Sequence, residues 1–462
     1  MELVGRSAAG LAELVRTGRS SASEVARAHL EQLARVEHRL GAFVVTRRRA
    51  ALDEAAAIDA RPDRDRLPLA GVPVAVKDEI DVAGEPTRFG SLATRPDAAR
   101  RDDPLVTRLR DAGAVVIGKA RSAELGLWGA TDDAGGVTVD PWDPSRSAGG
   151  SSGGAAAAVA AGVVPLALAT DGLGSIRIPA CACGVVGFKP GADLLPVRLP
   201  DGTPHWFGMT RHGPITTTVA DAALALCVLA DVDHFRGVPP IDRRLTVAVS
   251  VRSPLVVAPV AAAWRDAAVE AGRLLHHAGH AVRWADPAYD RRSVRAIFSR
   301  WTQGVAVEVE ALGVDLAKLQ PRSRTHVTLG QRLAERLPVT EADADHWRER
   351  ARRFFGEHDV LITPSAAHDP LPAVAWSRRS HAANVAASVL TYPFTAAWNL
   401  ADLPAVSVPL RQDPGRPRAL QVVGGPGQEQ LVLAVAALLE SLVPWTRHAP
   451  GWHVASDRAS GG

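Results

Sequence analysis

The sequence predicts an α/β fold: a single large domain with a mixed, mostly parallel central sheet that is covered by helices on both faces. Short apolar strands alternate with helical patterns along the chain, as they do when crossover helices join neighbouring strands. The 462 residues, 47% of them hydrophobic and 22% charged, are enough for a sizeable core. We find no internal repeat and no linker long enough to force a division into domains.

The first half of the chain predicts a helix followed by a strand–crossover–strand unit. Ser21 and Glu24 form a capping box, and apolar residues recur behind it at helical spacing. GVPVAVKDE (71–79) alternates valines with a period of two, which predicts a strand. A helix over 103–113, ended by a glycine, and a strand over 114–119 complete the unit.

The remaining elements continue this alternation. A helix of small residues at 153–162 leads into an apolar strand at 164–170. The uncharged run 148–170 is long enough to span a membrane, but its glycines and a proline break it, so we expect no transmembrane helix. Further helices are predicted at 217–230 and 428–442, and further strands at 245–250 and 420–425.

Composition excludes several classes of protein. A formal net charge of +3 on a chain of this size does not indicate a nucleic-acid surface. Cys181, Cys183 and Cys227 are too few for a disulfide framework and lack zinc-site spacing, so we expect buried apolar thiols. The N-terminal segment lacks the pattern of a signal peptide, which predicts a cytoplasmic protein. The last ten residues, 453–462, have the low hydropathy of a disordered tail.

Lysine is rare in this chain, and its positions are informative. Only four of the 53 basic side chains are lysines, at positions 77, 119, 189 and 318. Arginine keeps its proton near neutral pH, whereas a desolvated lysine can lose it and act as a base. Lys77 closes an apolar strand and is the predicted base, while Lys318 lies in a polar helical stretch. The alternative for each lysine is that it has no special role and remains by chance in a chain whose composition favours arginine.

Two glycine-rich loops carry serines. The first, SAGGSSGGAAAAVAAG (147–162), places Ser151 and Ser152 at a predicted helix N-terminus. It lacks the GK[ST] ending of a phosphate-binding loop. Gly149–Gly153 matches the G-x-S-x-G nucleophile elbow, but that motif needs a preceding strand, and DPWDPSRSA is not predicted to form one.

The second loop, within ALATDGLGSIRIPACACG (167–184), is the better nucleophile site. A predicted strand runs directly into it, so the glycines can expose Ser175. Backbone N–H groups of Gly172, Leu173, Gly174 and Ser175 can then form an oxyanion hole. A serine hydroxyl needs a base, and no histidine lies in either loop. A Ser–Lys arrangement with Lys77 as base and a second serine as proton relay meets this need. Both reactive groups follow strands whose carboxyl ends meet at one edge of the sheet.

These residues resemble the amidase signature family, and the match covers most of the chain. The matching segments are GVPVAVKDEIDVAGEPT (71–87), DPWDPSRSAGGSSGG (140–154), TDGLGSIRIPACACGVVGFKP (170–190), GPITTTVADAALAL (213–226), DVLITPS (359–365) and PFTAAWNLADLPAVSVP (393–409).

The resemblance implies a Ser-Ser-Lys triad, in which Ser175 is the acylated nucleophile, Lys77 the base and Ser151 the bridging serine on a non-proline cis peptide. It also implies a supporting network, no catalytic role for two of the lysines, and neither a metal nor an organic cofactor. The network residues are Ser152, Asp171 and Arg177, and the two lysines are Lys119 and Lys189.

The resemblance further implies one amidase domain over residues 1–462. Its expected parts are an N-terminal helical region (1–65), the signature core (66–230), a variable substrate-pocket region (231–358) and the C-terminal part of the core (359–450).

Two positions depart from the family pattern. The family usually reads TDxGGSIR, and Leu173 replaces the first of those glycines, which either reshapes the acyl pocket or weakens the oxyanion hole. Glu79 stands where the family often has asparagine, which alters the polarity at the end of the strand.

The resulting hypothesis is an amidase that hydrolyses a carbon–nitrogen bond of a small-molecule amide, with no nucleic-acid or membrane partner and a homodimer left open. One alternative is the glutamine-hydrolysing subunit of a tRNA amidotransferase. Another is an acyl-transfer or weakened homologue in which Leu173 has impaired hydrolysis. Four aromatic residues near the motifs are candidates for an apolar acyl pocket, with burial in the core as the other interpretation: Trp128, Trp206, Phe207 and Trp398.

Overall fold

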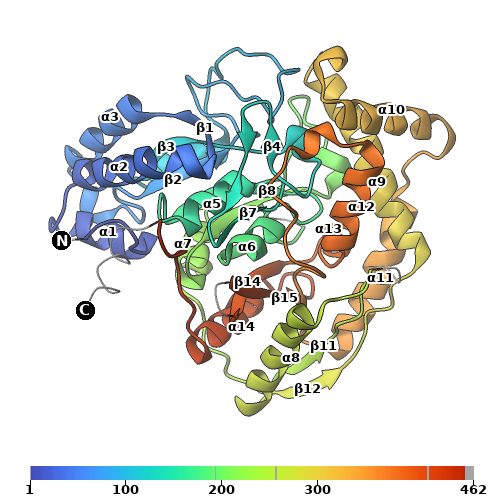
Figure 1. The fold of residues 1–462 in the computed structure, drawn as a ribbon. Helices are drawn as coiled ribbons and strands as arrows, with labels where there is room; N and C mark the ends of the chain where they lie inside the picture. Colours follow the sequence, from blue (N-terminus) through green and yellow to red (C-terminus); the bar gives the residue numbers. More distant parts are fainter. Residues whose placement is uncertain (1, 193, 255–257, 414–415, 453–462) are drawn as a thin grey trace.

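A large mixed sheet runs through the middle of the protein (Figure 1). The computed structural model describes residues 2–192, 194–254, 258–413 and 416–452. Within them, eleven strands lie in the order β1-β3-β2-β8-β10-β9-β14-β15-β13-β11-β12. Their bounds are β1 (Phe43–Thr46), β2 (Pro73–Lys77), β3 (Val115–Ala120), β8 (Leu166–Asp171), β9 (Val186–Lys189), β10 (Arg211–Thr216), β11 (Thr246–Val249), β12 (Ala281–Trp284), β13 (Val360–Pro364), β14 (Ala405–Asp413) and β15 (Arg416–Gly424).

The sheet is mixed, as expected, but the expectation that it is mostly parallel is wrong. Among the described strands, only β2–β3, β2–β8, β11–β12 and β11–β13 pair in parallel. The other six neighbouring pairs are antiparallel. Two features cause this: β14 turns directly back into β15, and β10 returns between β8 and β9. A hairpin can only be antiparallel, whereas parallel neighbours need a longer crossover.

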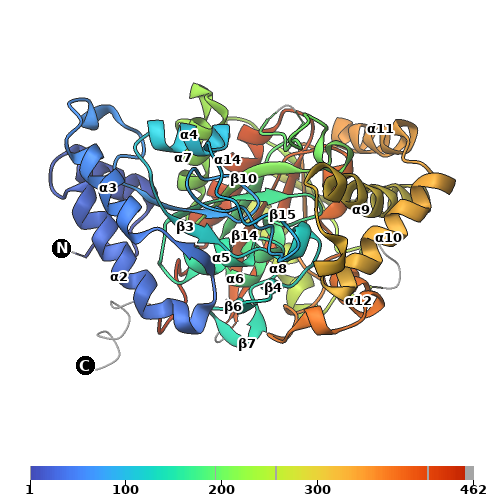
Figure 2. The same ribbon diagram turned by 90° about the horizontal axis from the view of Figure 1, so that it is seen from above.

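Helices cover both faces of the sheet and both of its ends. Figure 2 shows α4, α7 and α14 on one side of the strands and α5 and α6 on the other. In Figure 1, α1–α3 lie on the left beside the first strands of the sheet, α8 lies beside β11 and β12 at its other end, and α9–α12 lie along the right-hand side. The bounds are α1 (Ala8–Arg16), α2 (Ala22–Leu40), α3 (Arg48–Asp59), α4 (Pro104–Asp111), α5 (Gly153–Ala160), α6 (Arg177–Cys183), α7 (Val219–Ala230), α8 (Ala262–His277), α9 (Arg291–Ala311), α10 (Pro321–Arg336), α11 (Glu341–Glu357), α12 (His381–Thr391), α13 (Ala396–Leu400) and α14 (Glu429–Leu442).

Most of the predicted elements are present with small shifts at their ends. The capping box forms as expected: the backbone N–H of Glu24 donates to Ser21 Oγ (3.0 Å), and that of Ser21 donates to Glu24 Oε2 (2.8 Å). The run 148–170 contains α5 and β8 rather than one long helix. In the described part of the chain, none of the helices has both the length and the apolar character needed to cross a membrane.

One local prediction is wrong and another lies outside the described residues. A short strand, β7 (Asp143–Ser147), precedes the first serine loop and pairs with β6 (Val139–Asp140). β6 and β7 form a small two-stranded sheet apart from the main sheet, and β7 is only partly buried. The sequence of β7 is therefore polar and lacks the apolar pattern by which a buried strand is predicted. The predicted tail at 453–462 is not among the described residues.

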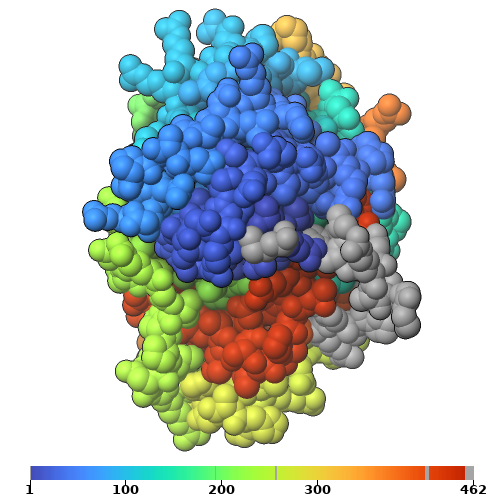
Figure 3. Space-filling model, turned by 90° about the vertical axis from the view of Figure 1, so that its left-hand side faces the viewer, coloured from blue at the N-terminus to red at the C-terminus, as the bar shows by residue number. Residues whose placement is uncertain are grey.

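The N-terminal helices dock onto the core through a buried carboxylate. Asp221 on α7 accepts hydrogen bonds from the backbone N–H groups of Ala8 and Ala9, at 2.9 and 3.0 Å. These are unpaired donors in the first turn of α1, which a carboxylate satisfies well. In the space-filling view of Figure 3, the N-terminal segment and the C-terminal part of the chain lie on the same face of the molecule.

Candidate active site

A buried lysine lies at the carboxyl end of β2, next to the central strand β8. Lys77 is fully buried, and its Nζ lies 2.7 Å from Ser151 Oγ, 2.7 Å from Thr170 Oγ1 and 2.9 Å from Glu79 Oε2. Burial lowers the pKa of Lys77, because a desolvated ammonium is disfavoured, and the nearby Glu79 carboxylate opposes that shift. The structure thus brings together the predicted base and the predicted bridging serine.

The carboxylate of Glu79 is held by three donors. It accepts from Thr170 Oγ1 at 2.8 Å, from Ser122 Oγ and from Lys77. Burial alone would raise the pKa of Glu79, but Lys77 and the two hydroxyls outweigh it and keep the pKa below its ordinary value. Glu79 is therefore ionised when Lys77 carries its proton.

The loop that carries Ser151 is fixed by its neighbours. The Gly150–Ser151 peptide bond is cis. Thr131 Oγ1 donates to the carbonyls of Gly149 (2.8 Å) and Ser151 (3.1 Å) and accepts from the N–H of Gly153 (3.0 Å). No space exists for a side chain at position 150, because a Cβ there would lie 2.1 Å from the Trp128 carbonyl oxygen. The glycines of this loop allow close backbone approach.

The loop that carries Ser175 follows β8 directly, as predicted. Gly174 has φ +123°, a conformation that favours glycine, and a Cβ there would lie 2.2 Å from Thr395 Oγ1. Thr395 Oγ1 also donates to the Leu173 carbonyl at 2.6 Å, which fixes the turn. The Ser152 N–H donates to the Ser175 carbonyl at 3.3 Å, so the two serine loops lie against each other.

Behind this turn lies the predicted supporting pair of Asp171 and Arg177, both fully buried. Arg177 Nε and Nη2 each lie 3.0 Å from an Asp171 oxygen, and Asp171 also accepts from the N–H of Gly174 at 2.7 Å. Asn399 and Gln421 contact the pair from the C-terminal part of the chain. Burial would raise the pKa of Asp171, but the guanidinium and the hydrogen bonds hold it well below its usual range.

The last member of the predicted network, Ser152, lies within the same buried cluster. Its Oγ donates to the carbonyl of Thr170 at 3.2 Å. This bond ties the start of α5 to the end of β8, the two segments that hold Ser151 and Ser175.

A cavity of about 260 Å³ opens beside Ser175. Leu173 and Gly150 also line it, so both serine loops reach its wall. The rest of the lining comes mainly from α9, α12 and the segment 126–129, and none of the described residues in it carries a charge. The lining residues on these elements are Gly126, Leu127, Trp128, Gly129, Val294, Ile297, Phe298, Trp301, Val385, Ser388 and Val389.

Of the four aromatic residues predicted for this pocket, only Trp128 lines the cavity. Trp206 packs against Gly172 instead, since a Cβ on Gly172 would lie 2.8 Å from its ring. Phe207 lies near the Arg300 guanidinium, 5.9 Å from the ring centre. Trp398 is fully buried in the core, 5.9 Å from Trp347 between ring centres. Three aromatic residues that line the cavity were not predicted from the sequence: Phe298 and Trp301 on α9, which has no recognisable motif, and Tyr392 at the end of α12.

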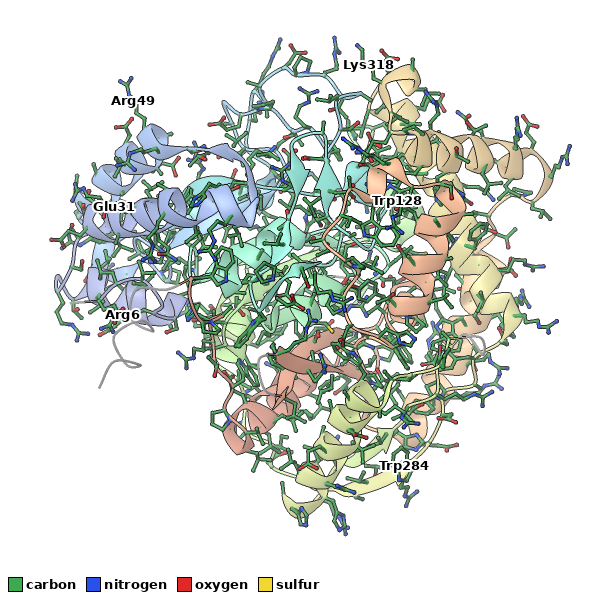
Figure 4. All side chains as sticks on the ribbon, in the orientation of Figure 1. Arg6, Glu31, Arg49, Trp128, Trp284 and Lys318 are labelled. Carbon is green, nitrogen blue, oxygen red and sulfur yellow. The ribbon has the colours of Figure 1, made fainter. Side chains whose placement is uncertain are left out.

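The other lysines have different environments. Lys119 is buried in an ion pair with Asp78 at 3.1 Å, and Lys189 donates to the Pro190 carbonyl at 2.8 Å. Lys318 pairs with Asp315 at the surface and lies at the upper edge of the molecule in Figure 4. In the part of the chain that the structure describes, no group of three His, Cys, Asp or Glu side chains is arranged to hold a metal ion.

Comparisons with known proteins agree on one family. The family model described as Amidase matches residues 24–433. The chain is 37% identical over 460 residues to the putative amidase AmiB2 of Mycobacterium tuberculosis (strain ATCC 25618 / H37Rv), covering 97% of this chain and 98% of that protein. It is 33% identical over 471 residues to an acylamidase of Rhodococcus erythropolis, covering 96% and 97%. The structure of a bacterial aryl acylamidase of the amidase signature enzymes superposes with a TM-score of 0.84 at 26% identity, covering 96% and 97%.

Proposed function

The chain belongs to the amidase signature family of amide hydrolases, and from this we propose that it cleaves small, uncharged amides through an acyl-enzyme on Ser175. One observation carries the proposal: the Nζ of a fully buried lysine is hydrogen-bonded to Ser151, next to the loop that presents Ser175 to an apolar cavity. Such an amine can act as a base only if it is desolvated, and Lys77 is.

The proposed first step forms an ester between Ser175 and the acyl group. Ser175 Oγ bonds to the amide carbon while its proton passes to Ser151 Oγ, and the proton of Ser151 passes to the neutral amine of Lys77. The carbonyl electron pair moves to the oxygen, which accepts hydrogen bonds from the backbone N–H groups of Gly172, Leu173 and Ser175. The N–H of Gly174, which the sequence predicted as a further donor, instead donates to Asp171. When the carbonyl re-forms, the carbon–nitrogen bond breaks. The leaving nitrogen receives a proton from Ser151, which takes one back from Lys77.

The second step hydrolyses that ester by the same route in reverse order. A water molecule donates its proton through Ser151 to Lys77, and its oxygen bonds to the acyl carbon. Collapse of the resulting intermediate returns the proton to Ser175 Oγ and releases the carboxylic acid. Lys77 is again neutral, so one water is consumed in each cycle and no other co-reactant is needed.

The lining of the cavity supports an apolar acyl group as the substrate class. Leucine, valine, isoleucine and aromatic side chains surround Ser175 without a charged group. Burying a charged ammonium or carboxylate there without a partner would be costly. This argues against glutamine, which carries both groups, and therefore against a role as the glutaminase subunit of an amidotransferase. The names of the relatives, acylamidase and aryl acylamidase, point in the same direction.

The direct test of the proposed function is covalent trapping. A small fluorophosphonate should add one phosphonyl group to the wild-type chain, located on Ser175 by peptide mass spectrometry, and none to Ser175→Ala. Wild-type protein should hydrolyse acyl anilides faster than glutamine. Labelling of Ser175 without hydrolysis of any amide would favour the weakened or acyl-transfer alternative, and modification of another side chain would contradict the proposal.

Leu173 is expected to control the size of the acyl group. Its side chain lines the cavity and its backbone φ is not in the left-handed region, so the substitution of glycine by leucine leaves the turn intact. Leu173→Ala should shift the ratio of kcat/KM for benzoyl over acetyl anilide by about 10-fold in favour of benzoyl, since a pocket difference of a few methyl groups discriminates at this level.

The measurement is kcat/KM across a series of acetyl, butyryl and benzoyl anilides. Leu92→Ala, at an exposed leucine, is the matched control and should leave the ratio unchanged. An equal loss for every member of the series would instead mean that Leu173 acts on the oxyanion hole and does not shape the pocket.

A further inference from the structure

We propose that Glu79 is a positioning residue for the lysine base: it directs the free electron pair of Lys77 toward Ser151 and stabilises the ammonium that forms during each step. This inference rests on the proposed function. It gives a role to a carboxylate at a position where the family often has asparagine.

The contacts of Lys77 leave little freedom in how it can be protonated. Its Nζ has three polar neighbours, namely Ser151, Thr170 and Glu79, at 2.7, 2.7 and 2.9 Å. Glu79 accepts a hydroxyl proton on each of its oxygens, from Ser122 on Oε1 and from Thr170 on Oε2, so it is an acceptor toward Lys77 as well. Since Thr170 donates its only proton to Glu79, it can only accept from Lys77.

These constraints orient the neutral amine. A neutral lysine has two N–H groups and one free electron pair. The two acceptor-only neighbours, Glu79 and Thr170, take the two N–H groups, so the electron pair faces Ser151 Oγ. That is the direction from which the proposed relay delivers its proton.

After the transfer, the same contacts suit the ammonium. Lys77 then has three N–H groups for three acceptors, and its new positive charge lies 2.9 Å from the Glu79 carboxylate. At a pH where the resting Lys77 is neutral, the ion pair therefore forms as negative charge develops on the substrate oxygen. An interaction that strengthens in the transition state accelerates the reaction. An asparagine or glutamine at position 79 could accept the hydrogen bond but could not supply the charge.

Other charged groups also face Lys77, and their states constrain the interpretation of a pH profile. Asp171 on β8 is ionised and neutralised by Arg177. Burial lowers the pKa of His212 on β10 to about 3, so it stays uncharged over the working range. The remaining group is Glu308 on α9, which pairs with His205 at 3.2 Å.

The sign of the expected pH effect follows from these charges. Activity requires a neutral Lys77, so kcat/KM falls as the pH drops through the value at which the lysine gains its proton. A neighbouring carboxylate favours the charged lysine and moves that fall to higher pH. Removing the charge of Glu79 should therefore extend activity to lower pH.

The test compares pH profiles of the wild type and Glu79→Gln. We call the fall of kcat/KM on the acidic side of the profile the acidic limb. We expect this limb to lie about 1–3 pH units lower in the variant, the usual effect of one close opposite charge. At alkaline pH the variant should be slower by about 10-fold or more, because the lysine is a weaker base and its ammonium is less stabilised. The second-order rate of fluorophosphonate labelling of Ser175 should show the same displacement of the limb.

Matched variants separate this role from a structural one. Glu79→Asp keeps the charge and should keep the limb within a unit of wild type, although at a lower plateau. Glu79→Asn should repeat the downward shift and decides the matter if Glu79→Gln does not fold. Glu37→Gln removes a half-buried carboxyl that does not face Lys77 and should leave the profile unchanged.

Three results would overturn the inference. A lower plateau with an unmoved limb in Glu79→Gln and Glu79→Asn would mean that Glu79 only supports the fold. If the fall of kcat/KM at acidic pH disappears in His205→Gln, that fall is caused by the His205 imidazole and not by Lys77. A wild type that neither hydrolyses amides nor is labelled at Ser175 would remove the proposed function and this inference together, whereas labelling with an unmoved limb would remove the inference alone.

Discussion

Lys77→Arg is expected to reduce turnover by about 10⁴-fold or more, the scale found when a member of a catalytic unit is removed. Lys77 is fully buried and is hydrogen-bonded to Ser151. Arginine keeps the positive charge but does not release its proton near neutral pH, so it cannot accept one from the relay. The measurement is kcat/KM with an acyl anilide, together with the rate of fluorophosphonate labelling of Ser175.

Lys318→Arg is the matched control for this substitution. It makes the same chemical change at a lysine on the surface and should leave both rates unchanged. Circular dichroism and the melting temperature check that Lys77→Arg folds, and Lys77→Met, which is neutral and close in shape, should be equally inactive. Retention of turnover in Lys77→Arg would refute the assignment of Lys77 as base.

Arg177→Met is expected to destabilise the protein by about 3–5 kcal/mol, because it leaves the carboxylate of Asp171 buried without its partner. The free energy of unfolding, measured by urea denaturation at pH 7, gives this loss. Activity should fall as well, since Asp171 accepts from the N–H of Gly174 and so fixes the loop that presents Ser175. Arg236→Met, which removes an exposed ion pair with Asp233, is the control and should leave stability nearly unchanged.

The destabilisation by Arg177→Met should shrink in acid. In the wild type, Asp171 has a lowered pKa, so its stabilising effect is present at neutral pH and declines as the pH falls below the ordinary value of 3.8. In the variant, the buried carboxyl takes up a proton more readily and is relieved of its unpaired charge. A gap between the two unfolding curves that stays constant from pH 7 to pH 3 would contradict this account.

The proposed catalytic residues could be selected from the sequence because each has a local signal. Lys77 stands out in an arginine-rich chain, and the glycines around Ser151 and Ser175 mark tight backbone turns. The pairing of the sheet was harder, because the position of β10 between β8 and β9 depends on contacts that no local pattern encodes. The α/β class was correct, but the share of parallel strands was not.

The pocket could not be predicted from proximity to the motifs. Trp206 and Trp398 lie near motif residues in the sequence but are buried elsewhere, whereas Trp301 lines the cavity from a helix more than 100 residues away from Ser175. The role proposed for Glu79 could not be predicted from the sequence either. The sequence marks it as a departure from the family pattern, and only the fold shows that it contacts Lys77.

The division of the site between two kinds of element has a consequence for how such a protein can evolve. The reactive groups are held by the sheet and its adjoining loops, while α9 and α12 supply much of the wall around the acyl group. Substitutions on those helices can therefore alter which compounds are accepted without disturbing the proton relay. A lineage with this arrangement can acquire new substrates by small steps while its chemistry is inherited intact.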